Sequence, residues 1–258
     1  MRPLSAMIFA AGYGTRLKPW TDSHPKALVE VDGVPMLGRV IQKLRHAGAE
    51  RIIINTHHFA KQIEKYLIDN DDFGCRILIS RENELLDTGG GVANALIKFG
   101  IEGPLLLHNA DILTDFDLVR MINAYADSGN STQLLMDTRT TSRYLLIDDN
   151  NTMQGWVNPG TSEVRGPAKN NSIETSSLRK LAFGGVHLLN EQTQRHLIQY
   201  STNCAVFSII DFYIEACNVE PIMAYVPKDE YLWHDVGTNE KLYTAREHWQ
   251  NKYHGQNV

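Results

Sequence analysis

Two glycines and two basic residues near the start of the chain have the types and spacing of a phosphate-binding loop. An apolar run, Met7–Ala11, leads into Gly12 and Gly14, so the backbone can turn sharply and present its N–H groups without a Cβ in the way. Arg16 and Lys26 follow, and they supply a planar and a compact positive charge. This pattern predicts a strand that leads into a loop for a nucleoside triphosphate.

Two better-known phosphate loops do not fit this segment. The dinucleotide-binding fingerprint needs a third glycine where Leu17 stands, and a Walker A loop needs a Gly-Lys-Ser/Thr tripeptide, which the sequence lacks. A bare Gly-x-Gly is also common in ordinary turns. The prediction therefore depends on the residues that accompany the two glycines. These residues are Thr15, Arg16, Pro19, Thr21, Pro25 and Lys26.

Two aspartates far apart in the sequence have the chemistry of magnesium ligands. Asp111 and Asp235 each follow a short apolar run, and ligands bind at the carboxyl ends of the strands in open α/β sheets. Mg²⁺ prefers one or two carboxylates together with phosphate oxygens and waters. An aspartate in such a position is also common as a helix cap or a turn residue, so the residues alone leave both roles open.

A run of three glycines forms a third segment that suits a ligand. Leu86–Ala93 contains this run and predicts a glycine loop that opens a helix, where a flat base or sugar would lie against the backbone at Gly90. A flexible strand-to-helix turn is the alternative.

The composition is typical of a soluble enzyme. With 258 residues, of which 43% are hydrophobic and 21% charged, the chain can bury a full core. A net charge of −5 without a basic stripe argues against a nucleic-acid partner. The three cysteines show no metal-ligand spacing, which fits reduced thiols in the cytoplasm. The apolar run Leu4–Ala11 is too short to span a membrane, so we expect a cytoplasmic monomer or small homo-oligomer with no membrane partner.

Short β-branched runs alternate with amphipathic helical patterns in the first half of the chain. This order predicts an α/β fold with a Rossmann-like, mostly parallel sheet flanked by helices. The predicted strands are Ser5–Ala11, Arg51–Asn55, Cys75–Ser80, Leu105–Asn109 and Gln133–Met136. Two intervening helices bury apolar stripes, which are Met36, Leu37, Val40, Ile41 and Leu44 in the first, and Ile63, Tyr66 and Leu67 in the second.

The second half contains a small β-rich insertion followed by mixed elements. Asp148–Asn151 is predicted as a turn between two short strands, and the polar segment Asn158–Ser177 as a mobile loop over the site or a disordered surface. The later predicted elements are strand Lys180–Leu189, helices Gln192–Tyr200 and Ser208–Cys217, strands Ile222–Val226 and Tyr231–Val236, and a helix capped by Thr238 that ends near His248. No hexapeptide repeat follows, so we expect one domain over residues 1–258 without a C-terminal β-helix.

The first loop closely resembles the signature of the sugar-1-phosphate nucleotidyltransferases, or sugar-nucleotide pyrophosphorylases. That signature is Gly-x-Gly-Thr-Arg-(Leu/Met)-x-Pro-x-Thr with a Pro-Lys pair shortly after, and the chain matches it from Gly12 to Lys26. Asp111 matches the family's central aspartate, although Ala110 stands where glycine is common. Asp235–Thr238 matches its Asp-x-Gly-Thr metal motif. The resemblance covers essentially the whole chain and favours the metal role of both aspartates.

The resemblance implies Mg²⁺-assisted, in-line transfer of a nucleotidyl group from a nucleoside triphosphate to a sugar 1-phosphate, with release of pyrophosphate. Arg16 would steady the leaving pyrophosphate and Lys26 would cover the α-phosphate. The implied site residues are Arg16, Lys26 and Asp111 for catalysis, Asp111 and Asp235 for the metal, Ala11, Gly12, Gly14, Thr15 and Gly90 for the nucleotide, and Phe183 and Gly185 for the sugar. A structural bulge at Phe183–Gly185 would have the same sequence.

The acceptor is the least determined part of the site. The Glu-Lys-Pro segment of many relatives is missing, and Arg165, Lys169 and Lys180 are the available basic replacements. The chain resembles most the family members that join UTP to N-acetylmuramate 1-phosphate in cell-wall recycling. Mannose or heptose 1-phosphate guanylyltransferases and choline-phosphate cytidylyltransferases share the first loop, and a regulatory protein that binds a nucleotide without catalysis is an alternative of another class.

Overall fold

The computed structural model describes residues 3–170 and 173–254, and the chain forms two compact units, each built from discontinuous segments. One, here called the terminal unit, contains Pro3–Leu85, His108–Leu118 and residues 231–254. The other, here called the central unit, contains Leu86–Leu107 and Val119–Glu230.

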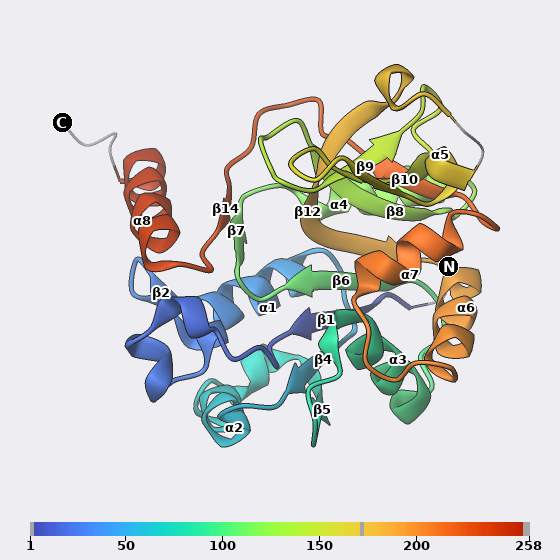
Figure 1. Ribbon diagram of the computed structural model, residues 1–258. Helices are drawn as coiled ribbons and strands as arrows, with labels where there is room; N and C mark the ends of the chain where they lie inside the picture. The colour runs from blue at the N-terminus through green and yellow to red at the C-terminus, as the bar shows by residue number, and fades with distance from the viewer. Residues whose placement is uncertain (1–2, 171–172, 255–258) are drawn as a thin grey trace. The chain divides into compact units, whose positions relative to one another are not determined.

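Three parallel strands organise the terminal unit (Figure 1). β1 (Ser5–Phe9) pairs with β4 (Arg51–Thr56), and β4 pairs with β5 (Arg76–Arg81). The consecutive isoleucines 52–54 of β4 are fully buried, which is typical of a parallel strand covered on both faces. The predicted strands at these positions are confirmed to within two residues at each end.

Helices α1 (Met36–His46) and α2 (Ala60–Asp69) connect these strands. The structure confirms the predicted apolar stripes as core. The buried members are Met36, Leu37, Val40, Ile41 and Leu44 in α1, and Ile63 and Leu67 in α2, whereas Tyr66 is only half-buried.

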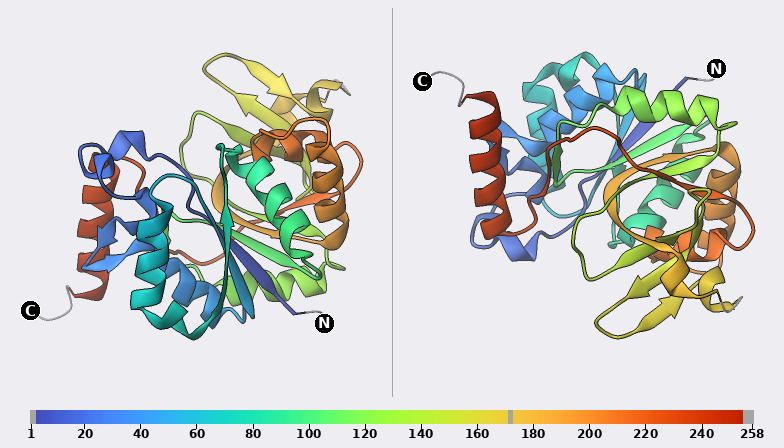
Figure 2. Two further views of the ribbon diagram at one scale, coloured as in Figure 1. Left: turned by 90° about the horizontal axis from the view of Figure 1, so that it is seen from below. Right: turned by 90° about the horizontal axis from the view of Figure 1, so that it is seen from above.

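The rest of the terminal unit consists of short ladders, 3₁₀ turns and one long helix. Figure 2 shows that helix, α8, in red beside the blue segment that carries β2, and the two elements are in contact. The strands are β2 (Glu30–Val31), β3 (Val34–Pro35), β7 (Ile112–Thr114) and β14 (Trp233–Asp235), the helix is α8 (Asn239–Tyr253), and the turns are Thr15–Leu17, Trp20–Asp22, Lys26–Leu28 and Asp71–Gly74. The Thr238 hydroxyl accepts a hydrogen bond from the Lys241 N–H and caps α8 as predicted, but α8 extends past the predicted end at His248.

Asp115 ties α8 to the segment that follows β7. Its carboxylate accepts hydrogen bonds from the Leu232 N–H (2.7 Å), the Tyr253 hydroxyl (3.0 Å) and the Lys252 ammonium. Burial acts to raise the pKa of this carboxyl, but Lys252, Leu232 and Tyr253 together outweigh burial and hold it below its usual value.

This depressed pKa predicts a pH-dependent stabilisation by Lys252. A carboxylate with a lowered folded-state pKa stabilises the fold above its unfolded pKa of about 4 and loses that effect as the pH falls through the folded value. We expect Lys252→Met to lower the free energy of unfolding by less than about 1 kcal/mol at pH 7, because the pair is partly exposed. Urea unfolding from pH 7 to below pH 4 checks this. A deficit that does not shrink below pH 4 would contradict it.

The central unit is mainly antiparallel. β12 (Arg179–Leu189) pairs with β8 (Thr132–Asp137) and β9 (Tyr144–Ile147), while β13 (Ile222–Tyr225) runs parallel to β8. Its other elements are β6 (Leu105–Asn109), which continues into the terminal unit, β10 (Met153–Asn158), β11 (Glu163–Arg165), α3 (Asp87–Phe99), α4 (Leu118–Asp127), α5 (Pro167–Asn170), α6 (Glu191–Ser201), α7 (Ile209–Ala216) and the 3₁₀ turn Thr175–Ser177. The α/β class predicted from the sequence, with its small β-rich insertion, is confirmed.

The insertion corrects one prediction. Asp148–Asn151 is the expected turn between β9 and β10, but Asn158–Ser177 is not simply a loop, because it contains β11 and α5. β11 pairs with β10, and Ala168 packs with Leu146 and Val157 in an apolar cluster. Strand pairing and apolar burial thus order this segment, although its polar composition predicted no strand or helix. Residues 171–172 of this segment lie outside the described part of the chain.

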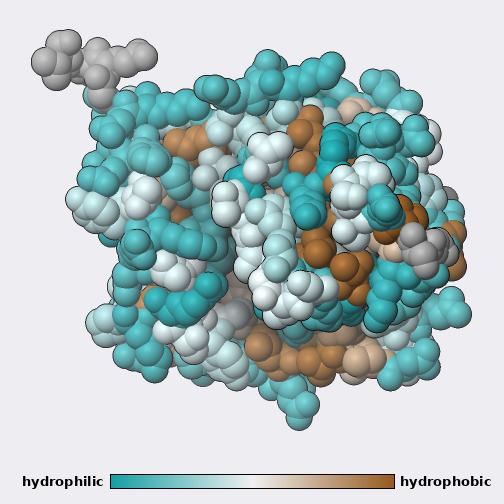
Figure 3. Space-filling view, turned by 45° about the horizontal axis from the view of Figure 1, so that its top comes forward, coloured by the Kyte–Doolittle hydropathy of each residue, from teal (hydrophilic) through white to brown (hydrophobic). Residues whose placement is uncertain are grey.

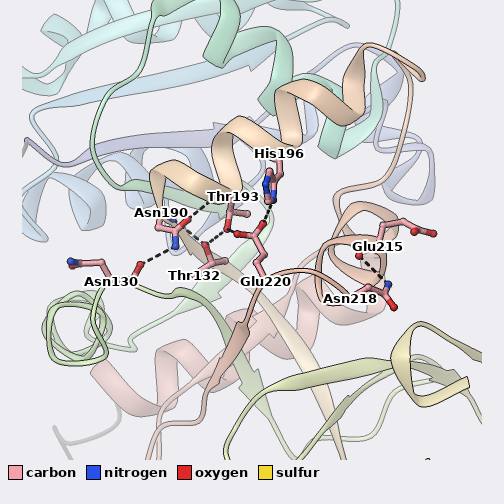
Figure 4. A network of polar contacts seen from close by, with 8 residues as sticks. All are labelled: Asn130, Thr132, Asn190, Thr193, His196, Glu215, Asn218 and Glu220. Atoms are coloured by element: carbon pink, nitrogen blue, oxygen red, sulfur yellow. Dashed lines mark hydrogen bonds and ion pairs between the residues drawn. The ribbon is translucent and has the colours of Figure 1, made fainter. Parts of the chain in front are cut away.

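A buried polar network joins β8, α6 and the segment before β13 (Figure 4). The Asn190 N–H donates to the Thr132 hydroxyl (3.1 Å), which donates to Thr193 (2.7 Å), and the Thr193 hydroxyl donates to the Glu220 carboxylate (3.1 Å). His196 Nδ1 lies 2.9 Å from the other oxygen of Glu220, a side chain that is almost fully buried. Thr193 is therefore the central connection of the network.

Replacing Thr193 with valine is expected to lower the free energy of unfolding by about 1–3 kcal/mol, because it removes hydrogen bonds from a buried hydroxyl and a buried carboxylate. Urea unfolding measures the difference. Thr202→Val is a matched control at the end of the same helix, where the hydroxyl makes one exposed hydrogen bond to the Gln199 carbonyl, and it should change stability by less than about 0.5 kcal/mol. Equal losses in the two variants would contradict the role of the network.

Hydrophilic residues surround several separate hydrophobic groups on the face shown in Figure 3. No helix in the described part of the chain is long and apolar enough to cross a membrane. The three cysteines, Cys75, Cys204 and Cys217, are free thiols, as their spacing predicted.

Candidate active site

The β7–β14 ladder brings the two predicted metal aspartates together in the terminal unit. Asp235 lies opposite Ile112, the residue after Asp111, and the Val236 N–H donates a hydrogen bond to the Asp111 carbonyl (2.9 Å). Asp111 itself lies in the tight turn between β6 and β7. Two carboxylates from distant parts of the sequence thus come from adjacent backbone segments.

A lysine binds each of these carboxylates. Lys26 makes an ion pair with Asp111, and both side chains are largely buried. Lys241 Nζ lies 2.6 Å from Asp235, whose other oxygen accepts a hydrogen bond from the Gly237 N–H (2.8 Å). Burial acts to raise the pKa of Asp235, but Lys241, the Gly237 N–H and the charge of Lys26 outweigh it and lower the pKa. Asp235 is therefore held as an anion.

Gly237 is the point at which the charged groups converge. A Cβ added there would lie 2.6 Å from the Asp235 carboxylate, 3.1 Å from the Arg16 guanidinium and 3.2 Å from the Lys26 ammonium. The glycine of the Asp-x-Gly-Thr motif therefore leaves space for two cations and a carboxylate around one backbone position.

The predicted phosphate loop turns at Gly14. Gly14 adopts a left-handed conformation with φ of 65°, and a Cβ there would lie 2.7 Å from the Cβ of Lys26. The Thr21 hydroxyl donates to the Gly14 carbonyl (2.9 Å). Nothing lies within 4 Å of a Cβ built on Gly12. Gly14 is thus required by the approach of Lys26, whereas the space beside Gly12 is open.

Buried polar side chains hold the start of this loop. The Ala10 N–H donates to Asn55 Oδ1 (2.8 Å), and Asn55 Nδ2 donates to the buried Glu82 (2.7 Å). Beyond them, the Tyr13 hydroxyl lies 3.0 Å from His57 Nε2, and His57 Nδ1 lies 2.9 Å from the Glu82 carbonyl. The turns after β4 and β5 therefore support the loop that follows β1.

The donor set at Asp111 and Asp235 fits a magnesium ion. Each carboxylate now binds an ammonium group, which a metal ion would have to displace. In residues 3–170 and 173–254 no group of three or more His, Cys, Asp and Glu side chains has metal-site geometry. Two protein carboxylates match an ion that takes its remaining ligands from phosphates and waters.

The three glycines after Thr88 lie inside a helix rather than in a loop. α3 begins at Asp87, and the N–H groups of Gly89 and Gly90 donate to the Phe207 carbonyl at 2.9 and 3.3 Å. A Cβ on Gly90 would clash with the Ala205 carbonyl oxygen. The segment with Ala205 and Phe207 therefore makes the close approach that glycine permits here. The Phe207 carbonyl also satisfies N–H groups in the first turn of α3. The contact between Gly90 and a nucleotide stays a prediction.

β12 contains an irregularity at the predicted sugar-facing residues. The register with β8 shifts between Phe183 and His187, and Gly185 has φ of 77°. The sequence left open whether these residues form a structural bulge, and the structure contains one. Arg139 donates a hydrogen bond to the Phe183 carbonyl, so the bulged strand is held from the side.

A cavity of about 460 Å³ in the central unit includes Phe183 in its lining together with three arginines, Arg139, Arg143 and Arg165. Arg165 Nη1 lies 2.7 Å from Asp211, and its guanidinium is 5.9 Å from the centre of the Trp156 ring. Of the basic residues that the sequence offered for the acceptor, Lys169 and Lys180 do not line this cavity.

The fold and site invite comparison with known proteins. Residues 5–252 match the nucleotidyl transferase family. The chain belongs to this family. The family resemblance seen in the sequence motifs is therefore confirmed, and the match includes every residue of the charged group around Gly237.

Among the relatives of this chain are two N-acetylmuramate alpha-1-phosphate uridylyltransferases. The one from Caulobacter vibrioides is 42% identical over 42% of this chain and 46% of its own length, and the one from Neisseria meningitidis is 43% identical over 44% and 49%. These alignments span about half the length of the relatives. A solved UDP-glucose pyrophosphorylase in complex with UDP-glucose shares the fold, with a TM-score of 0.77, 18% identity and coverage of 98% of this chain and 100% of its own.

Sequence reasoning missed several residues that the structure places in the charged group, in the support of the first loop or in the central cavity. Lys241 had a usable signal, because it follows the Thr238 cap by three residues and must lie on the first turn of α8. The others had none, since their role depends on pairing between distant segments: Asn55, Glu82, Arg139 and Arg143.

Proposed function

We propose that this protein transfers a nucleotidyl group from a nucleoside triphosphate to a sugar 1-phosphate and releases pyrophosphate. The observation that carries the proposal is the convergence of Arg16, Lys26 and Asp235 around Gly237, with Asp111 bound to Lys26. Attack of one phosphate on another is slow chiefly because both are anionic and must be aligned. Two carboxylates beside two cations suit a metal–triphosphate complex better than binding of a nucleotide alone.

In this reaction Asp111 and Asp235 would hold Mg²⁺, which would supply charge neutralisation at the reacting phosphates. Arg16, which is exposed, binds the leaving pyrophosphate. Lys26 leaves Asp111 when the nucleotide arrives and covers the α-phosphate. Lys241 keeps Asp235 anionic and oriented through its 2.6 Å contact. The N–H groups of the loop from Ala11 to Thr15 hold the nucleotide.

We propose an acidic sugar 1-phosphate as acceptor, with N-acetylmuramate 1-phosphate and UTP as the substrate pair. The central cavity supports this choice, because three guanidinium groups and the Trp156 and Phe183 rings line it. Arginine recognises carboxylates in a bidentate manner, and aromatic faces suit the apolar side of a sugar. The arginines of this cavity would therefore bind the anionic groups of the acceptor.

A pyrophosphate-release assay tests the reaction. UTP, GTP, CTP, ATP and dTTP are each combined with N-acetylmuramate, glucose, mannose and heptose 1-phosphates and with phosphocholine. Release that requires one nucleotide, one acceptor and Mg²⁺, and that stops with chelator, supports the proposal. A guanylyl or cytidylyl product would show that the protein uses another substrate pair, but it would support the proposed type of reaction. Nucleotide binding without release under any combination would favour a regulatory binding protein.

Arg143 provides a separate test of the acidic acceptor. Its exposed guanidinium lines the cavity, and a hydrogen bond to a charged group contributes about 1.5–3 kcal/mol. We expect Arg143→Gln to raise KM for N-acetylmuramate 1-phosphate at least tenfold, with little change for N-acetylglucosamine 1-phosphate. Arg195→Gln, on the exposed side of α6, is the matched control. Equal KM changes for both sugars would exclude a carboxylate-specific role.

A further inference from the structure

The terminal unit contains a second cavity, of about 380 Å³, away from the charged group around Gly237. α1 contributes Arg39 and Lys43 to its lining, the segment of β7 contributes Thr114 and Asp115, and α8 contributes Trp249. Its lining does not include Arg16, Lys26, Asp111 or Asp235. Its volume lies within the range of about 300–1,000 Å³ that is common for small-molecule sites.

Arg39 has hydrogen-bonding capacity that the fold does not use. One terminal nitrogen donates to the Val31 carbonyl (2.5 Å), and the guanidinium lies 4.7 Å from the centre of the Trp249 ring. Its Nε is buried and has no hydrogen-bond partner among the described residues. A buried donor without a partner destabilises the fold, so an acceptor that reached Nε from the cavity would remove that penalty.

Lys43 is a second unused cation on the same helix, one turn from Arg39. It is half-buried, and within residues 3–170 and 173–254 its ammonium makes no hydrogen bond or ion pair. Burial lowers the pKa of Lys43, and the carboxylates of Asp115 and Asp117 only partly oppose this. The charge of Lys43 also reaches the fully buried His108, where burial is the main cause that lowers the pKa to about 4.

In the described part of the chain, the acidic residue of the cavity makes no hydrogen bond to Arg39 or Lys43. Asp115 accepts hydrogen bonds from Leu232, Lys252 and Tyr253, so its oxygens are already occupied. His46 adds a further donor at the exposed edge. The cavity therefore offers unsatisfied donors beside an apolar wall that includes Met36, Val40 and Trp249.

We infer that this cavity is a second ligand site, which binds a phosphate monoester of a small organic molecule. Arg39 and Lys43 bind the phosphate, whose oxygens can accept from several donors at once, and the organic part lies against Trp249. The site is separate from nucleotidyl transfer and does not rest on that activity.

Phenyl phosphate is a suitable probe, because its ring would shift the indole N–H resonance of Trp249 in a two-dimensional NMR spectrum. A Trp249→Phe variant assigns that resonance among the four tryptophans. We expect saturable binding by the wild type, at least tenfold weaker binding by Lys43→Gln, and wild-type binding by Lys43→Arg, which keeps the charge.

Two controls separate this site from the catalytic one. Asp111→Ala, which alters the site of transfer, should bind phenyl phosphate at Trp249 as the wild type does, and so should Lys65→Gln, which loses an exposed ion pair on α2. No saturable shift at Trp249, or equal binding by Lys43→Gln and the wild type, would overturn the inference.

Discussion

Replacing either Lys26 or Asp111 with alanine is expected to lower turnover about a hundredfold to a thousandfold. Each side chain is assigned to charge neutralisation at the reacting phosphates, and loss of one preorganised group of this kind removes roughly 3–4 kcal/mol of transition-state stabilisation. The two residues form one ion pair, so the double variant should lose much less than the product of the single effects. Steady-state pyrophosphate release measures all three.

Thermal unfolding of the same variants shows whether the fold is intact. Lys65→Ala is the matched control, since it breaks an exposed lysine–aspartate pair on α2 and should keep wild-type turnover. Near-normal turnover in Lys26→Ala or Asp111→Ala would reject the role assigned to that residue.

Gly237→Ala is expected to lower turnover about a hundredfold while the protein still folds. The added methyl group would meet the ends of three charged side chains, those of Asp235, Arg16 and Lys26, rather than backbone. Such ends can move, so the fold survives, but displacement of catalytic groups by about 1 Å can cost about a hundredfold in rate. Turnover at saturating substrate, together with a thermal melt, checks both parts.

Gly33→Asn is a control for the loss of a glycine. Gly33 lies in the turn between β2 and β3, nothing is within 4 Å of a Cβ built there, and its φ of 68° is one that asparagine tolerates. This variant should keep wild-type turnover. If Gly237→Ala is equally active, the crowding around Gly237 has no catalytic meaning.

The sequence predicted the elements well where periodicity was strong. α1 was predictable from its stripe of apolar residues, and β1, β4 and β5 from short β-branched runs that end in polar residues. α8 was predictable at its start, because the Thr238 cap is a local signal, but not at its end. Local chemistry fixes such boundaries only where a specific residue interrupts the pattern.

The site was predictable only in part because its geometry depends on pairing between distant segments. Motif residues identified Asp111 and Asp235, but only the β7–β14 ladder explains why they meet. The glycines of α3 permit close packing against Ala205 and Phe207, which their sequence did not predict, and the contact of Gly90 with a nucleotide stays a prediction. Composition likewise could not predict β11 and α5, which depend on burial against β10.

The route of the chain through the two units has a consequence for synthesis on the ribosome. All residues of the central unit precede Tyr231, whereas the terminal unit also needs β14 and α8. During vectorial translation, Asp111 and Lys26 emerge long before Asp235 and Lys241 are made. A nascent chain that stops before Trp233 therefore contains the complete central unit but lacks one of the two carboxylates, so the charged group around Gly237 can form only after the central unit has been made.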